Sequence, residues 1–190
     1  MIKKNLFILQ PKIQHYRIPV FELLKTKLQE EYNISVFGLT DNGKAFNGEK
    51  KSYFNNEYYL RFFGIEFWPF IIFKILKKKP DLIIATTSPR NLTSWVLPFI
   101  CKTLNIKLIG WSKINSISEN YCKFIQYFKK SLYSKYKFLI VYGQKSAQEF
   151  KSFRLKNNAI TIANNTIDTV YVRKNKQEIT HNSKLIKQKY

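Results

Sequence analysis

Acidic residues are scarce in this 190-residue sequence, and their scarcity sets its charge. Twelve Asp and Glu stand against 33 Lys and Arg, so the formal net charge is +21. Such a surplus attracts polyanions over long distances, and phosphorylated substrates, anionic lipids and nucleic acids are all candidate partners. A second interpretation of the charge stays open, because a chain crowded with Lys, Asn and Ile is also what an AT-rich genome encodes.

Cysteine and histidine are too few for a disulfide framework or a paired-histidine metal site. Cys101 and Cys122 have neither zinc-binding nor redox spacing, so we predict buried or half-buried thiols in a reducing cytoplasm. The only histidines are His15 and His181. We therefore expect no metal and no cofactor.

Long apolar runs and glycine-rich phosphate-binding motifs are also missing. No uncharged run approaches the ~18 residues of a membrane-spanning helix, and the apolar start of the chain ends at Gln10, too early for a signal peptide. The absence of G-x-G-x-x-G and G-x-x-x-x-G-K-[ST] excludes Rossmann-type dinucleotide binding and P-loop nucleotide hydrolysis. Without a nucleophile elbow or a close carboxylate pair, the catalytic residues stay unknown.

The sequence does contain a regular alternation of strand-like and helix-like segments. Continuous apolar runs, such as residues 6–9, are typical of parallel strands buried on both faces. The predicted strands are residues 6–9, 34–39, 58–63, 81–85, 106–110, 138–141 and 159–163. The predicted helices are residues 19–31, 68–78, 92–104, 119–136 and 144–153. This pattern predicts an α/β fold with a Rossmann-like doubly wound parallel sheet of about seven strands.

Residues 1–168 are predicted to form this domain, and the polar, basic residues 169–190 are interpreted as a linker or tail. Residues 40–56 are polar and turn-rich, and are predicted to form a long surface loop. Gly38, near the end of the second predicted strand, is expected to allow a close backbone approach.

Ligands of open α/β sheets bind beyond the carboxyl ends of the strands, where four polar loops are expected to converge. These loops are residues 10–17, 86–91, 111–116 and 142–146. The candidate substrate-binding residues are Gln10, His15, Tyr16, Arg17, Thr86, Thr87, Ser88, Trp111, Ser112, Lys113 and Tyr142. Tyr16 and Arg17 can present a ring and a guanidinium to a sugar or phosphate; alternatively, Tyr16 packs and Arg17 caps a helix. His15 is either a ligand contact or an exposed loop imidazole.

Two segments combine aromatic and basic residues. Residues 62–73 carry six aromatic rings, with Lys74 and residues 77–79 close behind, a pattern that fits an anionic lipid interface. The basic helix predicted over residues 119–136 interleaves lysines with Tyr and Phe. This second segment is either a similar surface or an ordinary core stripe with a solvated basic face.

Five motifs occur in an order that resembles a known enzyme family. They are Tyr-Arg-Ile-Pro-Val-Phe at residues 16–21, Pro-Asp-Leu-Ile-Ile at 80–84, the strand at 107–111 that ends in Trp, Val-Tyr-Gly at 141–143, and Asn-Asn-Thr-Ile-Asp at 164–168. Together they resemble the N-terminal half of a family 4 glycosyltransferase, which has the GT-B fold. The last motif is similar to the Asn-x-(Ile/Val)-Asp segment at which such enzymes leave their first domain, so Asn165 and Asp168 would shape an interdomain hinge.

The resemblance implies a retaining, hexosyltransferase-type enzyme that moves a sugar from a nucleotide-sugar to an acceptor without an essential metal. Its N-terminal domain would hold the acceptor, lipid-linked or polysaccharide, and touch the membrane. Its C-terminal domain would bind the nucleotide-sugar. Many relatives carry His-Gly after the Trp strand, whereas this chain has Ser112 and Lys113 there. Lys113 could replace the missing histidine only as a charge near phosphate.

No segment after Asp168 has the pattern of a second nucleotide-binding sheet. We therefore expect a cytoplasmic acceptor-binding domain of polysaccharide biosynthesis, peripheral on the inner face of the plasma membrane and inactive as a transferase alone. A nucleotide-sugar would be a partner only if a donor domain is supplied. The alternatives are a non-catalytic basic module that binds anionic membranes or nucleic acid, and a degenerate remnant without activity. Nucleic acid is the less favoured partner, because no recognition motif accompanies the basic residues.

Overall fold

The computed structural model describes residues 2–13, 17–40, 53–112, 123–153 and 159–163. Its helices are α1 (Ile18–Leu28), α2 (Pro69–Lys78), α3 (Leu92–Thr103), α4 (Lys123–Tyr133) and α5 (Gln144–Ser152). Its strands are β1 (Lys4–Ile13), β2 (Tyr32–Thr40), β3 (Phe54–Asn56), β4 (Leu60–Phe62), β5 (Ile65–Phe67), β6 (Leu82–Thr86), β7 (Lys107–Ser112), β8 (Phe138–Val141) and β9 (Ala159–Ile162).

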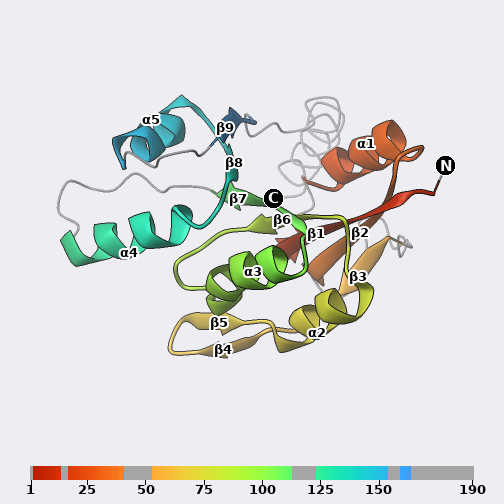
Figure 1. Ribbon diagram of the computed structural model, residues 1–190, viewed down its shortest axis with the longest axis horizontal. Coiled ribbons are helices and arrows are strands. Elements are labelled where there is room, and N and C mark those ends of the chain that lie inside the picture. The colour runs from red at the N-terminus through yellow and green to blue at the C-terminus, as the bar shows by residue number, and fades with distance from the viewer. Residues whose placement is uncertain (1, 14–16, 41–52, 113–122, 154–158, 164–190) are drawn as a thin grey trace, which may run out of the picture.

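Seven of the strands form one parallel sheet in the order β3-β2-β1-β6-β7-β8-β9. The chain starts in the middle with β1, runs outward through β2 and β3, and returns to the other side of β1 with β6 (Figure 1). The predicted doubly wound α/β fold is confirmed. Its winding reverses between β1 and β6, and this is the point at which such sheets bind ligands.

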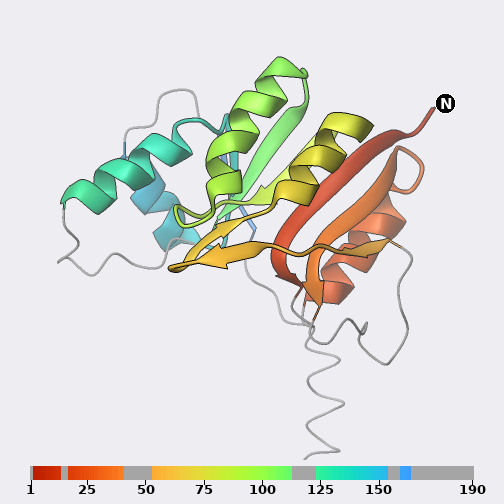
Figure 2. The same ribbon diagram turned by 90° about the horizontal axis from the view of Figure 1, so that it is seen from below.

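Helices cover both faces of the sheet. The helices α2 and α3 lie on one face and α1 on the other (Figure 2). Successive side chains of a strand point to opposite faces, so Phe7 and Leu9 of β1 pack under α2 and α3, whereas Leu6 and Ile8 pack against α1. A third cluster of buried residues joins α4 and α5 to β8.

The third strand of the sheet is not where the sequence predicted it. Residues 58–63 were expected there, but β3 takes the edge position beside β2, inside the predicted loop 40–56. The edge position needs a buried apolar side chain, and Phe54 supplies it by packing edge-on against Phe21 of α1. Residues 60–62 form β4 instead, which pairs antiparallel with β5 in a separate hairpin.

A close backbone approach determines how β1 ends. The pairing of β1 with β2 shifts register between Leu9 and Lys12. A Cβ on Gly38 would lie inside 3.0 Å of the Gln10 carbonyl oxygen, a distance that real Cβ atoms essentially never reach. The close approach predicted at Gly38 is confirmed, because only glycine fits there.

No helix among the described residues is long and apolar enough to span a bilayer. The same residues contain no group of three or more His, Cys, Asp or Glu that could hold a metal ion. Cys101 is buried, as predicted, whereas Cys122 lies outside the described residues.

Candidate functional site

Arg17 connects side chains from three of the four predicted loops. Its guanidinium donates hydrogen bonds to the side-chain oxygen of Gln10 and to the hydroxyl of Tyr142. Its Cζ lies 5.3 Å from the ring centroid of Trp111 and 5.4 Å from that of Tyr142. The two rings are tilted by 34° with centroids 5.9 Å apart. These four residues, Gln10, Arg17, Trp111 and Tyr142, are called the Arg17 cluster. The other three lie 7 to 125 residues from Arg17 in sequence, but all four form one site.

The start of α1 explains why Arg17 turns toward the sheet. Arg17 is the N-cap residue of α1, but its side chain makes no capping hydrogen bond. Pro19 lies in the first turn, where a missing N–H costs nothing. Phe21, fully buried one turn further on, packs edge-on against Trp111 with ring centroids 6.4 Å apart. Helix α1 therefore positions Arg17 at its N-terminus, and its Phe21 supports the Trp111 ring that lies beside the guanidinium.

Strand register brings the fourth loop to the same edge. Thr86, the last residue of β6, pairs with Trp111 of β7. The preceding register pair joins Leu9 of β1 to Ala85 of β6, so Gln10 and Thr86 are the next residues of neighbouring strands. Gln10 and Trp111 lie in strands that run further than predicted, so the sheet itself positions them.

Several polar atoms at this edge are buried without a hydrogen-bond partner among the described residues. They are Gln10 Nε2, Thr86 Oγ1 and Trp111 Nε1. Gln10 is 0% exposed. A buried donor without an acceptor costs about 1–3 kcal/mol, so such groups normally meet water or a ligand. Two N–H donors and a hydroxyl beside a guanidinium favour a ligand rich in oxygen acceptors, such as a sugar or a phosphate.

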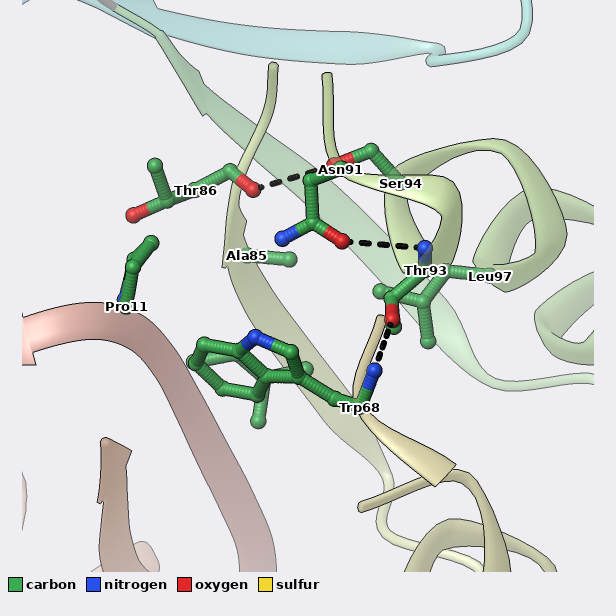
Figure 3. A pocket seen from close by; sticks show the side chains of 9 residues that line it. Pro11, Trp68, Ala85, Thr86, Asn91, Thr93, Ser94 and Leu97 are labelled. Carbon is green, nitrogen blue, oxygen red and sulfur yellow. Dashed lines mark hydrogen bonds between the residues drawn. The ribbon is translucent and has the colours of Figure 1, made fainter. Parts of the chain in front are cut away.

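A small pocket lies close to this edge, lined by residues of β1 and β6, by Trp68 just before α2, and by Asn91 and the first half of α3 (Figure 3). Its volume of about 10 Å³ has room for one water molecule. Asn91 Oδ1 accepts a hydrogen bond from the Thr93 N–H, and Thr93 Oγ1 accepts one from the Trp68 N–H, both at 2.9 Å (Figure 3). The pocket is too small for a sugar, and its hydrogen bonds fix the connection between β6 and α3.

Three predicted site residues make hydrogen bonds within the fold. Ser112 is fully buried, and its hydroxyl lies 3.3 Å from the Thr87 carbonyl oxygen and 3.1 Å from the Tyr133 hydroxyl. The Thr87 hydroxyl donates to the Ala85 carbonyl at 3.1 Å. Ser88 Oγ accepts a hydrogen bond from the backbone N–H of Arg90 at 3.3 Å. These hydroxyls brace the ends of β6 and β7, a role that residue type alone does not reveal.

Burial keeps the neighbouring ionisable groups neutral. Burial raises the pKa of Tyr133, which the hydrogen bond from Ser112 partly opposes. Burial also raises the pKa of Tyr136, whose hydroxyl donates to the Ser94 carbonyl at 2.7 Å. Both phenols therefore stay protonated and hydrogen-bonded within the fold.

The basic helix divides between the two interpretations that the sequence left open. Tyr133 of α4 is buried against Phe150 of α5, as a core stripe requires. Tyr127 is 69% exposed. The core interpretation therefore applies to the C-terminal part of α4, where Leu132 is also buried.

Some predicted residues lie outside the described part of the chain. These are His15, Tyr16, Lys113 and the two hinge residues, Asn165 and Asp168. Conversely, sequence reasoning did not select Phe21 or Trp68 for this edge of the sheet. Their only signal was apolar spacing, which is the same for a residue that supports a site and for one that fills a core.

Comparison with protein-family models and with curated proteins found no match to this chain. The fold and the site define an α/β protein whose Rossmann-like sheet carries a cationic, aromatic cluster at its carboxyl edge. Membership of the glycosyltransferase family stays a prediction.

Proposed function

We propose that residues 1–168 are the acceptor-binding domain of a glycosyltransferase that transfers a sugar from a nucleotide-sugar. The observation that supports this most is the Arg17 cluster, where a stacked guanidinium and buried N–H donors meet at the ligand-binding edge of the sheet. The ordered sequence motifs add support, since those at residues 16–21, 107–111 and 141–143 contribute Arg17, Trp111 and Tyr142 to this cluster.

The chemistry of the cluster matches a phosphorylated, sugar-bearing acceptor. The charge of Arg17 would attract phosphate oxygens, while Gln10 Nε2 and Trp111 Nε1 offer donors for sugar or phosphate oxygens. The rings of Trp111 and Tyr142 offer apolar faces to the C–H groups of a sugar. The hydrogen bonds to Gln10 and Tyr142 hold the guanidinium in one orientation before any ligand binds, which reduces the entropy lost on binding.

The domain binds and orients the acceptor and performs no catalytic step by itself. Glycosyl transfer requires the acceptor hydroxyl and the nucleotide-sugar to be held together, and positioning of this kind supplies much of the rate enhancement. A nucleotide-sugar-binding domain is therefore a required partner. We place the complex at the cytoplasmic face of the membrane, where a lipid-linked acceptor would be presented.

A non-catalytic module that binds anionic membranes is the second candidate. The observation that favours it is the group of exposed aromatic side chains on β4, α2 and the turn between β4 and β5. The two candidates differ at the Arg17 cluster. The acceptor-binding domain requires a ligand there, whereas the membrane-binding module does not.

Titration with a short-chain prenyl diphosphate N-acetylhexosamine tests the proposal, with the free prenyl diphosphate and single-stranded RNA as competitors. We expect Arg17→Gln to weaken binding about tenfold or more, because charge-assisted hydrogen bonds contribute about 1.5–3 kcal/mol. Trp111→Phe keeps a ring but removes one donor, and a smaller loss is expected. Arg61→Gln, an exposed arginine on β4, is the matched control. Tight RNA binding without affinity for the sugar-bearing probe would refute the proposal.

A further inference from the structure

The β4–β5 hairpin exposes its apolar face. Phe62 pairs with Ile65, and Leu60 lies two residues earlier on the same face, whereas Arg61 and Glu66 pair on the opposite face. Leu60, Phe62 and Ile65 are 58%, 75% and 45% exposed. An amphipathic hairpin that served only the fold would turn this face inward, because burial of apolar surface is its main source of stability.

The tip of the hairpin is both strained and apolar. Phe63 has φ of 47° and Gly64 has φ of 78°, the positive pair that a tight hairpin turn requires. Asn or Asp fits the first of these positions better than a bulky residue, for which positive φ is an outlier. Phe63 is nevertheless there, and its side chain is completely exposed. In the isolated chain this residue has both a strained backbone and an exposed aromatic ring, and both are unfavourable. This combination points to a contact of Phe63 with another molecule.

Helix α2 continues the exposed apolar surface. Phe70 and Phe73 are 61% and 65% exposed on its outer side, while Ile71 and Ile75 fill the core beneath it. Helix α2 is about 15 Å long at 1.5 Å per residue, and three lysines, residues 77–79, stand at its C-terminal end. The outer side of α2 therefore changes from aromatic to basic along its length.

The hairpin is fixed to the edge of the sheet that carries the Arg17 cluster. The Glu66 N–H donates to the Arg90 carbonyl at 2.8 Å, and the Trp68 N–H donates to Thr93 Oγ1 at 2.9 Å. Arg90 belongs to the connection between β6 and α3, which follows the carboxyl end of β6, and Thr93 lies in the first turn of α3. The hairpin and the start of α2 lie together beside this connection (Figures 1 and 2).

We infer that Phe62, Phe63, Ile65, Phe70 and Phe73 form a docking surface that inserts into the interface of an anionic lipid bilayer. Between residues 60 and 103 the chain has seven Lys and Arg but only two acidic residues. Aromatic rings next to such cations match the boundary between acyl chains and anionic headgroups. A second copy of the chain fits less well, since it would bring two strongly cationic surfaces together.

This inference deepens the proposed function, because it sets the membrane beside the edge at which a lipid-linked acceptor would bind. The docking surface and the Arg17 cluster share no residue. Vesicle binding and acceptor binding are therefore separate measurements, and either can fail while the other holds.

Co-sedimentation of the full chain with vesicles tests the inference. We expect binding to vesicles that mix phosphatidylcholine with phosphatidylglycerol, weaker binding to phosphatidylcholine alone, and loss of binding in high salt. The double variant Phe62→Ser/Phe63→Ser should reduce the partition coefficient about tenfold or more, because each ring loses its transfer from water. Leu23→Ser, which changes a 59% exposed residue on α1 across the sheet, should bind like the wild type.

Because the replaced rings are exposed, the unfolding temperature of the double variant should equal that of the wild type, which separates docking from stability. Two results would overturn the inference. The first is equal vesicle binding by the double variant and the wild type, or no vesicle binding by either. The second is a dimer in solution that the double variant dissociates, which would make a second copy the occupant of the surface.

Discussion

Replacing Gly38 by alanine should disturb both the stability of the sheet and the Arg17 cluster. The added methyl group would lie inside 3.0 Å of the Gln10 carbonyl oxygen, 3.1 Å from its carbonyl carbon and 3.2 Å from Ile13 Cγ1. Two of these three atoms belong to the backbone of β1, which is held by β2 and β6 and cannot rotate away. The strand itself must therefore move.

The expected loss is about 2–3 kcal/mol of unfolding free energy. Overpacking costs about 1–3 kcal/mol, and a backbone obstacle belongs at the upper end of that range. The lower entropy of the unfolded alanine chain returns only about 0.4–1 kcal/mol. For a chain of this size each kcal/mol lowers the unfolding temperature by about 2–4 °C. Because Gln10 moves with the strand, acceptor binding by Arg17 should weaken as well.

Urea unfolding followed by circular dichroism measures this loss. Gly143→Ala is the matched control, since an added Cβ there has no heavy atom within 4 Å and Gly143 directly follows Tyr142 of the cluster. Its φ of 172° is extended backbone that alanine also adopts, so a change within about 1 kcal/mol is expected. Gly38→Ala with wild-type stability and wild-type acceptor binding would refute the packing argument.

Two further predictions concern buried groups. Burial raises the pKa of Cys101 from 9.0 to about 12, so in a Cys122→Ser background the native thiol should react slowly with Ellman's reagent at pH 8 and rapidly after denaturation. Fast native labelling would contradict its burial. The same pKa shift stabilises the fold below pH 9, where the Cys101 thiol is protonated in both the folded and the unfolded chain. This stabilisation should be lost as the pH rises toward 12, because the thiol of the unfolded chain ionises first. Tyr136→Phe leaves the Ser94 carbonyl without its 2.7 Å donor and should cost about 1–3 kcal/mol in urea unfolding; an unchanged midpoint would show that this bond contributes nothing.

The central strands were predictable because parallel strands buried on both faces leave continuous apolar runs. The runs at β6 and β8 are of this kind, and the structure places both inside the sheet. β3 was not predictable, because its residues Asn55 and Asn56 resemble a turn and only the pairing with β2 makes them a strand. Period-two patterns identify strands but not their partners, which is why residues 58–63 were assigned to the wrong sheet.

The location of the candidate site followed from the fold class, but the roles of its residues did not. Loops after parallel strands share one edge, so their polar residues could be named in advance. Whether a hydroxyl meets a ligand or the backbone depends on contacts between strands far apart in sequence. Ser112 illustrates this, since its partners are the carbonyl of Thr87 and the hydroxyl of Tyr133.

The aromatic segment at residues 62–73 shows the same limit. Its composition predicted a lipid-facing surface but not which rings would be outside. The structure buries Trp68 and exposes Phe62 and Phe63, which lie at the end of β4 and in the two-residue turn of the hairpin. The docking surface could therefore be defined only once the hairpin was known.

Titration of the wild-type chain and of Arg17→Gln with the prenyl diphosphate N-acetylhexosamine tests the central claim most directly. Saturable binding by the wild type, weakened about tenfold or more in Arg17→Gln and unchanged in Arg61→Gln, is the result that we predict. Equal affinities in all three proteins, or no binding by the wild type, would contradict an acceptor site at the Arg17 cluster.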